Sequence, residues 1–401
     1  MKITKIESIT FASLPRLLFV RVYTDEGLVG IGETYDKVPG SRGALHGMLA
    51  PILLGNDPRD IERMWRFCFD TILYHGFAGA ELRALSAVEM ALWDILGKSL
   101  HAPVYRLLGG AVRPTVSTYN TCIGHGAVND YARWHTDAGS LAAEMQAEGI
   151  RGVKIWPFDQ YTERTFGQNL RVEDIEAGLE PVRSIRRAVG RDFRIGIECH
   201  FRFSRAAAEQ LCYALEPHNI YFVEDPLPSV DTAEIKRLSQ ASRIPIVGSE
   251  TLLSRWQMRD WIANGVSQII MTDVAWTGGI AESKRIAAMA EAYGLPIVFH
   301  NAGGPVAHMA SLHLAAHVPN LFELEMVRAF YNTYFRELTD VDVAIRDGHV
   351  AIPSERPGLG VDFLPSVWAR SDINVQASTG EGKALGLSAM GDAWSKPDIR
   401  L

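Results

Sequence analysis

The feature that most constrains this chain is a series of eight short apolar segments, which begins at about Thr115 and alternates with segments of helical length. The apolar segments are TVSTYNTCIG, RGVKIWPF, RIGIECH, IYFVEDPLP, IPIVGSETL, QIIMTDVAW, LPIVFHNA and LFELEMV. Stretches such as VEDIEAGLEPVRSIRRAVG lie between them. Strands that alternate with helices pair in parallel, because a tight turn cannot join two parallel strands.

Eight such units predict an α/β fold in which a TIM-type (β/α) barrel covers residues 115–339. The later units repeat about every 25 residues, close to the roughly 30 expected when about 250 residues form eight units. An open, doubly wound sheet is the alternative. No glycine-rich dinucleotide-binding motif follows any of the apolar segments, which favours the barrel.

The 401 residues also leave room for a second domain beside a barrel of about 250 residues. In residues 1–114, LLFVRVYTDEGLVGIGET alternates around a turn at DEG, and helical patterns follow at 60–71 and 80–100. We expect an α+β capping domain there, completed by residues 340–401. The tail beyond about Trp368 is expected to be peripheral.

Composition narrows the class of partner. A net charge of −7 provides no excess of basic residues for binding nucleic acid. It does not exclude a small anionic substrate, because a few charges in a cleft decide such binding locally. Charged residues interrupt every apolar run before about 18 residues, so we expect neither a membrane span nor a signal peptide. Four cysteines without CxxC spacing fit reduced thiols in a cytoplasmic protein.

In six of the eight apolar segments, an ionisable residue stands at the carboxyl end of the predicted apolar strand. These residues are Glu198, Glu224, Glu250, Asp273, His300 and Glu325. A single one of these would be read as a solvated rim residue, a helix cap or a structural histidine. Six in phase on consecutive strands are expected to face one barrel mouth, where the active sites of such barrels are assembled.

Three of these residues predict a metal site. Glu198, Glu224 and Glu250 come from three successive strands, and three carboxylates cannot share a small buried space without a cation. The predicted ligands are all oxygen atoms, with neither sulfur nor clustered imidazole. This donor set favours Mg²⁺ over Zn²⁺.

An ordered set of motifs resembles the mandelate racemase subgroup of the enolase superfamily, from residue 1 to about 365. The motifs are SAVEMALWDILGK, VKIW, IECH, VEDPLP, GSET, TDVAWTGGI, FHNAGGP and ELE. The resemblance implies a barrel of the modified enolase type in a homo-oligomeric enzyme. Such an enzyme removes the proton next to the carboxylate of a small-molecule substrate.

The resemblance also implies roles for these residues. Glu198, Glu224 and Glu250 would bind one Mg²⁺ per subunit, Asp273 and His300 would form a proton-transfer dyad, and Glu325 would lie beside the substrate. The metal is needed because general base catalysis alone supplies only about 10²- to 10⁴-fold, too little to remove so weakly acidic a proton.

Two departures from the subgroup narrow the reaction. Racemases of the subgroup carry Lys-x-Lys where this chain has Lys154-Ile155-Trp156. Trp156 cannot accept a proton, so a two-base racemisation is disfavoured and Trp156 is expected to contact the substrate instead. Lys154 is expected to neutralise the substrate carboxylate or support the metal, with an ordinary exposed lysine as the alternative.

The second departure is His200, two residues after Glu198, which strand alternation would place on the same side. Glu-Cys-His resembles the Asp-x-His of galactonate and mannonate dehydratases, in which the histidine is a general acid. An acid at His200 and a base at His300 suit β-elimination of water from an acid sugar, an aldonate or aldarate, to give a 2-keto-3-deoxy acid. A structural role for His200 is the alternative.

The remaining expectations concern specificity and competing functions. The segments 13–16 and 35–42 are expected to close over the mouth. Predicted substrate contacts are Arg16, Arg202 and Asn301, with Tyr74, His75 and Trp276 as further candidates. A lactone cycloisomerase or an epimerase using the same enolate is the alternative enzyme, and a non-catalytic binding barrel is a third possibility.

Overall fold

The computed structural model describes residues 1–35, 40–76 and 78–380. Part of the predicted closing segment 35–42, and most of the predicted peripheral tail, lie outside the described residues. In the described part of the chain, every helix is too short or too polar to cross a membrane.

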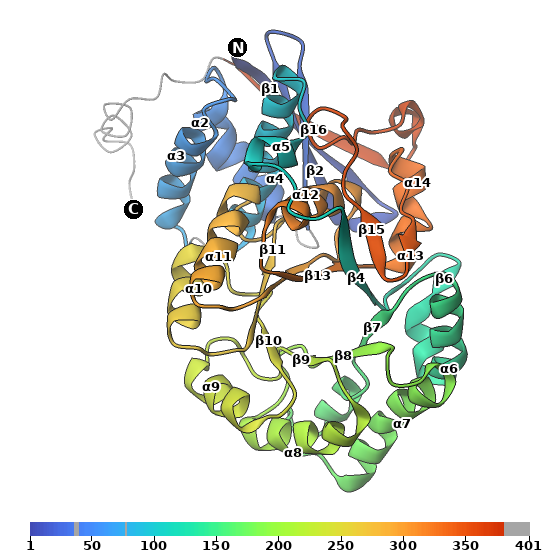
Figure 1. Cartoon of the computed structure of the whole chain (residues 1–401). Helices are drawn as coiled ribbons and strands as arrows, with labels where there is room; N and C mark the ends of the chain where they lie inside the picture. Colours follow the sequence, from blue (N-terminus) through green and yellow to red (C-terminus); the bar gives the residue numbers. More distant parts are fainter. Residues whose placement is uncertain (36–39, 77, 381–401) are drawn as a thin grey trace.

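The predicted barrel is confirmed. Eight parallel strands follow one another around a ring, and pairing of β13 with β4 closes it (Figure 1). The strands are β4 (Thr115–Thr121), β7 (Gly152–Ile155), β8 (Arg194–Glu198), β9 (Phe222–Glu224), β10 (Ile246–Gly248), β11 (Ile269–Asp273), β12 (Ile297–His300) and β13 (Leu321–Met326). Each of them lies within one of the eight apolar segments of the sequence.

Helices cover the outside of the barrel (Figure 1). They are α6 (Asp130–Ala147), α7 (Val172–Val189), α8 (Arg205–Leu215), α9 (Thr232–Ala241), α10 (Ser254–Ala263), α11 (Ile280–Ala292) and α12 (Pro305–His317). In α7, Ile175, Leu179 and Val182 are buried at a spacing of three or four residues, while charged side chains occupy the other face. This periodicity is what a helix needs in order to pack against a sheet.

The barrel interior shows why polar residues gather at one end. Phe222, Met271 and Val298 are buried together inside the ring. Two residues further along the same strands come Glu224, Asp273 and His300. Since side chains alternate between the two faces of a strand, each polar residue points to the same side as its apolar neighbour, at the carboxyl end.

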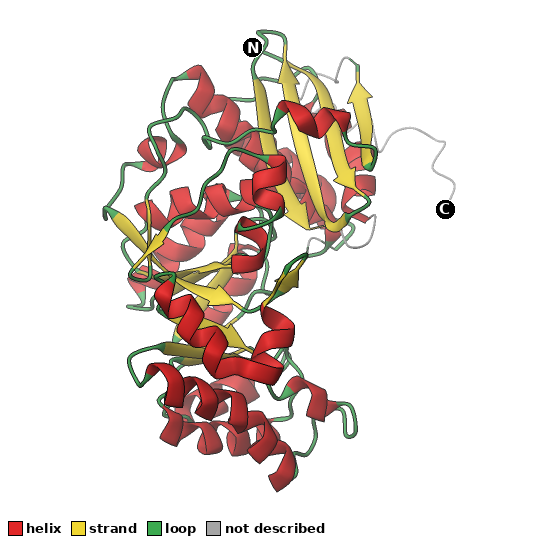
Figure 2. Ribbon diagram, turned by 90° about the vertical axis from the view of Figure 1, so that its right-hand side faces the viewer, coloured by secondary structure: helices red, strands yellow, loops and turns green. Residues whose placement is uncertain are grey.

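The capping domain is an antiparallel sheet of four strands packed against helices (Figure 2). The strand order is β16-β1-β2-β3, with β1 (Ile3–Phe11), β2 (Leu14–Thr24), β3 (Val29–Tyr35) and β16 (Ile373–Thr379). The longer helices are α3 (Ile61–Leu73) and α4 (Ala80–Ser99); the short ones are α1 (Gly40–Ala44), α2 (Ala50–Leu53) and α5 (Val104–Leu108).

The C-terminal part differs from its prediction in two places. The hairpin of β14 (Ile345–Arg346) and β15 (His349–Ala351), expected in the capping domain, pairs antiparallel with barrel strand β4. Strand β16 belongs to the region expected to be a peripheral tail, yet it pairs with β1 along seven residues. Its sequence, INVQAST, alternates apolar and polar residues as a strand does, although its side chains are mostly exposed.

Two buried glutamates of the capping domain hold the first turns of barrel helices. Glu33 of β3 accepts hydrogen bonds from the backbone amides of Gly304, Val306 and Ala307 at the start of α12. Glu89 of α4 accepts from those of Ile280 and Ala281 at the start of α11, at 2.7 and 2.8 Å. A carboxylate at a helix N-terminus satisfies amides that the helix itself cannot bond.

Candidate active site

A cavity of about 570 Å³ lies where the carboxyl ends of the barrel strands meet the capping domain. We call it the mouth cavity. From the barrel it is lined by Lys154, Trp156, Glu198, His200, Glu250, Trp276, His300 and Glu325, among others, and from the capping domain by Arg16, Tyr35 and Arg83. Sequence reasoning predicted most of the barrel residues in this set.

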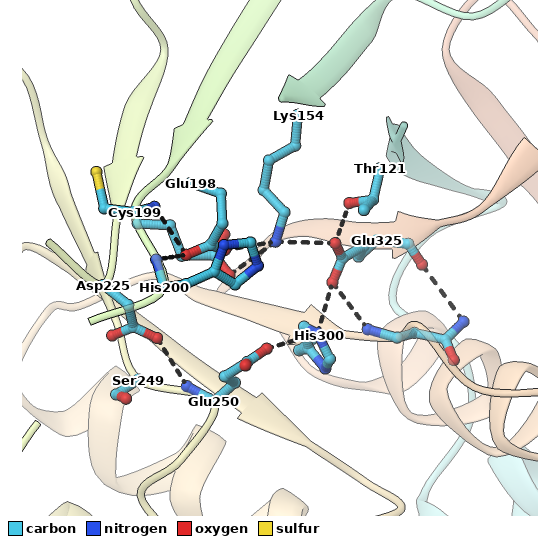
Figure 3. Close-up of polar contacts among 12 residues, drawn as sticks. Thr121, Lys154, Glu198, Cys199, His200, Asp225, Ser249, Glu250, His300 and Glu325 are labelled. Carbon is cyan, nitrogen blue, oxygen red and sulfur yellow. Dashed lines mark hydrogen bonds and ion pairs between the residues drawn. The ribbon is translucent and has the colours of Figure 1, made fainter. Parts of the chain in front are cut away.

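Lys154 connects three carboxylates at the base of the mouth cavity (Figure 3). Its Nζ atom lies 2.7 Å from Glu224 Oε1, 2.9 Å from Glu325 Oε1 and 3.2 Å from Glu198 Oε2. Burial by itself lowers the pKa of Lys154, but these carboxylates raise the pKa well above its ordinary value. Lys154 is therefore a permanent buried cation, which excludes the alternative of an exposed surface lysine.

Asp273 and His300 form the predicted pair. His300 Nδ1 lies 2.6 Å from Asp273 Oδ2, and the other carboxylate oxygen of Asp273 accepts a hydrogen bond from the Ala275 amide. These contacts leave His300 Nε2 facing the mouth cavity, where it lies 2.6 Å from Glu250 Oε2. Burial lowers the pKa of His300, but Glu250, Glu325 and Asp273 raise it well above its ordinary value.

The three predicted metal ligands are carboxylates, whose oxygen atoms are the donors that a hard cation such as Mg²⁺ prefers. Glu198 and Glu224 are register partners on adjacent strands, so their side chains point the same way. Glu224 Oε2 is buried and has no hydrogen-bond partner. Burial and the neighbouring Glu198 raise the pKa of Glu224 well above its usual range. A second cation beside Lys154 would relieve this buried negative charge.

The arrangement nevertheless differs from the predicted convergence of all three glutamates on one point. Across residues 1–35, 40–76 and 78–380, no three Asp, Glu, His or Cys side chains surround a common point as ligands do. Glu250 is the reason, since it pairs with His300. It also lies two residues beyond the end of β10, so strand alternation does not fix its direction.

Asp225 is a further buried carboxyl group that the sequence reasoning missed. It follows Glu224 directly, has a φ of 42°, and its Oδ2 accepts a hydrogen bond of 3.4 Å from the Glu250 amide. Burial, and then Glu198 and Glu250, raise its pKa well above the usual value. The signal was present in the sequence as the acidic pair in VEDP, of which only the first member was considered.

His200 reaches the mouth cavity by a route other than strand alternation. Strand β8 ends at Glu198, and His200 has a φ of 46°, in the left-handed region. A turn in the chain, and not the pleat of a strand, therefore brings it beside Glu198. Its ring lies against Trp156, with ring centroids 5.6 Å apart.

Asp159, which was not singled out from the sequence, is the partner of His200. His200 Nδ1 lies 2.6 Å from Asp159 Oδ2, the same separation and the same ring nitrogen as in the His300–Asp273 pair. Asp159 begins a 3₁₀ turn, Asp159–Thr162, in the loop after β7. Burial lowers the pKa of His200, but Glu198 and Asp159 together raise it above its ordinary value.

Some predicted substrate contacts do not line the mouth cavity. Arg202 is half exposed and lies 3.4 Å from Asp159. Asn301 is buried; its backbone N–H donates to Glu325 Oε2 at 3.0 Å and its side-chain amide donates to the Glu325 carbonyl at 3.4 Å, so it holds Glu325 instead of facing the cavity. Tyr74 and His75 are exposed outside the cavity. Their positions after strands or on loops gave no information on side-chain direction.

Arg16 and Trp276 do line the mouth cavity, as predicted, and so do residues that sequence reasoning missed. Tyr131, at the start of α6, stacks on Trp156 with ring centroids 5.6 Å apart. Arg83, on α4, lies over the Trp276 ring at 3.9 Å from its centroid. The sequence places Arg83 within a helical pattern, where an arginine is ordinarily a solvated residue, so the pattern gives no sign that this side chain lines a site.

Comparison with protein families gives two matches that together span most of the chain. Residues 5–109 match the N-terminal domain of mandelate racemase / muconate lactonizing enzyme, and residues 137–367 match the enolase C-terminal domain-like family. Among curated proteins, D-galactonate dehydratase of Pectobacterium atrosepticum is 33% identical over 375 residues, covering 90% of this chain and 92% of that protein. D-xylonate dehydratase of Haloferax volcanii is 30% identical over 355 residues, covering 86% and 82%.

Solved structures of similar proteins match the chain over almost its whole length. An enolase of the mandelate racemase subgroup from Agrobacterium tumefaciens superposes with a TM-score of 0.87 at 37% identity, covering 96% of this chain and all of that one. A putative dehydratase from Zymomonas mobilis superposes with a TM-score of 0.86 at 29% identity, covering 94% and 100%. The likeness therefore extends over both domains.

Proposed function

This chain belongs to the mandelate racemase / muconate lactonizing enzyme family of the enolase superfamily, and from that premise we propose that it is a magnesium-dependent acid-sugar dehydratase. The reaction would convert an aldonate or aldarate to its 2-keto-3-deoxy acid. The curated relatives are named as dehydratases of D-galactonate and D-xylonate, two acid sugars, which supports this class of substrate.

The observation that carries the proposal is a second Asp–His pair across the mouth cavity from the first. His200 follows β8 and His300 ends β12, four strands apart in a ring of eight, so they approach the cavity from opposite sides. Each has its Nδ1 held by an aspartate at 2.6 Å. This arrangement suits a dehydratase, because such an enzyme removes a proton at one carbon and protonates a hydroxyl at the next.

In the proposed reaction, His300 Nε2 takes the proton from C2, and the C–H electron pair moves into the C1–C2 bond as an ene-diolate. Asp273 holds the ring so that Nε2 faces the substrate and stabilises the cation that forms. The C3–O bond then breaks as His200 donates a proton to the departing oxygen, which leaves as water. The resulting enol takes up a proton at C3 and becomes the 2-keto acid.

Lys154 balances the charge of this intermediate. A buried ammonium next to the substrate carboxylate stabilises the two negative charges of the ene-diolate more strongly than the single charge of the substrate. Glu198, Glu224 and Glu250 would hold Mg²⁺, and Glu250 would exchange its contact with His300 for one with the metal. When bound, the metal supplies Lewis-acid stabilisation of the carboxylate oxygens.

Trp156 supports dehydration over racemisation. Its indole lines the mouth cavity between Tyr131 and His200 and offers no basic atom. Among the described lining residues, the histidine on that side is His200, which the proposal assigns to the leaving hydroxyl. A homo-oligomeric, cytoplasmic enzyme that binds neither nucleic acid nor membranes remains the expectation from the sequence.

The test is a screen of aldonic and aldaric acids with MgCl₂, in which 2-keto acid is detected, together with proton exchange at C2 followed by NMR in D₂O. We expect keto product from the wild type, and we expect His300→Asn to lose both product and exchange, because it removes the base. His349→Asn, at an exposed histidine of β15, serves as the control and should behave as wild type.

Other outcomes separate the alternatives. Exchange at C2 without keto product, for every acid tested, would replace dehydration with epimerisation. Exchange that survives in His300→Asn at the wild-type rate would remove His300 as the base and require another group, with Lys154 a candidate only if it loses its proton when substrate binds. If neither exchange nor keto product is seen with any acid, the remaining alternative is a non-catalytic binding barrel.

A further inference from the structure

Of the residues that the structure describes, those of the capping domain that line the mouth cavity are all cationic or phenolic. Among the described residues, Arg16 of β2, Tyr35 of β3 and Arg83 of α4 line it from that side, whereas the acidic lining residues Glu198, Glu250 and Glu325 all come from the barrel. The cavity is therefore polar in two different ways, with carboxylates at its base and guanidinium groups above them.

Neither arginine has a carboxylate partner in the described part of the chain. Arg16 and Arg83 both lack an ion pair within 4.0 Å and a hydrogen bond, although most arginines of the described chain have one or the other. Arg83 is half buried, with one face against Trp276 at 3.9 Å. Stacking on an aromatic ring satisfies the face of a guanidinium and leaves its N–H edge directed elsewhere.

The chemistry of these groups favours a carboxylate as their ligand. A sugar hydroxyl both donates and accepts, and it is ordinarily bound by mixed partners such as carboxylates and amides, whereas a guanidinium only donates. Its planar fork matches the two oxygens of a carboxylate. A half-buried cation without a partner also gains more from a full negative charge than from a neutral hydroxyl.

We infer that Arg83, assisted by Arg16, binds a second carboxylate at the far end of the substrate, so that this enzyme acts on dicarboxylic acid sugars in preference to monocarboxylic ones. The inference rests on the proposed function, in which Lys154 and the barrel glutamates take the carboxylate next to the reacting carbon. The curated relatives named above act on D-galactonate and D-xylonate, which carry a single carboxylate. A cavity of about 570 Å³ is within the size range of pockets that hold small organic ligands.

The test compares acids that differ only at the far end: galactarate with galactonate, and glucarate with gluconate, each with MgCl₂. We expect the wild type to have a kcat/KM at least about tenfold higher for the diacid of a pair. Arg83→Gln should lower kcat/KM for diacids about 10- to 100-fold, mainly through KM, and change that for monoacids by less than about threefold, as for loss of one charge-assisted contact. Arg16→Gln should act in the same direction and less strongly, because Arg16 is the more exposed.

Arg66→Gln is the matched control, because it removes the same charge from helix α3 of the capping domain, where Arg66 pairs with Asp70 in solvent. It should leave both classes of acid unchanged. Arg83→Lys keeps the charge without the fork and should retain part of the preference for diacids.

Three results would overturn the inference while leaving the proposed function standing: a wild-type preference for the monoacids, an equal loss for both classes in Arg83→Gln, or a preference for 6-phosphogluconate over glucarate. If no acid yields keto product, the proposed function fails, and calorimetry of galactarate and galactonate in MgCl₂ still judges the inference. Tighter binding of galactarate that disappears in Arg83→Gln would support it, and equal dissociation constants would contradict it.

Discussion

At the scale of single residues, the site is organised by what holds each histidine. His200 and His300 each have Nδ1 fixed by an aspartate at 2.6 Å, which sets the tautomer and turns Nε2 toward the mouth cavity. The partner comes from a neighbouring strand end for His300 and from a loop turn for His200. The two pairs therefore have the same local chemistry but are held by different kinds of element, a strand end and a loop turn.

We predict that the two steps of the reaction separate at His200. His200→Asn should keep exchange at C2 within about threefold of wild type while lowering formation of the keto acid by about 10²-fold or more, the usual contribution of a general acid. Asp159→Asn should lower kcat by a smaller factor without raising KM, because it disturbs the orientation of His200 and not substrate binding.

Arg202→Gln is the control for this pair of variants, since Arg202 also contacts Asp159 but does not line the mouth cavity. It should be close to wild type in both assays, measured by NMR exchange and keto-acid detection. An equal loss of exchange and elimination in His200→Asn would contradict the acid role.

At the scale of elements, the capping domain and the barrel are joined at the helices that follow the two dyad strands. Glu89 bonds the start of α11, which comes after Asp273, and Glu33 bonds the start of α12, which comes after His300. Trp65 adds a hydrogen bond of 2.8 Å to the Gly278 carbonyl in the same region. The docking of the domains thus also fixes the loops beside the proposed base.

We predict that this junction contributes strongly to stability. Glu89→Ala removes the acceptor for three N–H groups, the buried ones of Ile280 and Ala281 and the partly buried indole N–H of Trp93. Unsatisfied buried donors cost about 1–3 kcal/mol each, so the free energy of unfolding should fall by about 3 kcal/mol or more. Urea denaturation followed by tryptophan fluorescence measures the change.

The matched control is Glu62→Gln, which breaks an exposed ion pair with Arg285 between α3 and the same helix α11. Exposed ion pairs contribute about 0–1 kcal/mol, so this variant should unfold close to the wild-type urea concentration. If the two substitutions lower the free energy of unfolding equally, the buried contact contributes no more to stability than the exposed ion pair does.

At the scale of the whole molecule, the barrel mouth concentrates more negative charge than its own cations offset. Among the described residues, Lys154 and His300 form ion pairs with the carboxylates of Glu198, Glu224, Glu250 and Glu325, of which all but Glu250 are buried. Asp225 adds another acidic group nearby. A barrel that closes around this much buried charge is expected to gain stability from a bound cation.

We therefore predict that Mg²⁺ raises the melting temperature of the wild type and that EDTA reverses the shift. A ligand at about 100 times its dissociation constant stabilises the folded state by about 2.7 kcal/mol. Glu224→Gln should abolish most of the shift, because it removes a predicted ligand. The control Glu176→Gln, at an exposed glutamate on α7, should keep it.

Differential scanning fluorimetry with and without MgCl₂ measures the shift, and titration calorimetry gives the affinity. A wild type that neither shifts nor takes up Mg²⁺ would contradict the metal site. An unchanged shift in Glu224→Gln would place the ion elsewhere.

The sequence by itself determined the barrel and the identity of the residues at its mouth. Alternating strands and helices permit few topologies, and alternation along a strand sends every second residue inward, so Glu224, Asp273 and His300 could be placed without coordinates. The prediction misses strand β16 although INVQAST alternates apolar and polar residues, because this short stretch leads into a tail rich in Ser, Gly and Lys and the prediction includes it in that tail.

Only the tertiary structure decided how the site is completed. His200 and Asp225 adopt positive φ values that strand periodicity does not describe, and Asp159 meets His200 across 41 positions of sequence. Arg83 belongs to a helix of the other domain, and its direction depends on how that domain docks on the barrel. Local patterns report the period of a single element, whereas these contacts depend on where separate elements end and how they pack, which no local period contains.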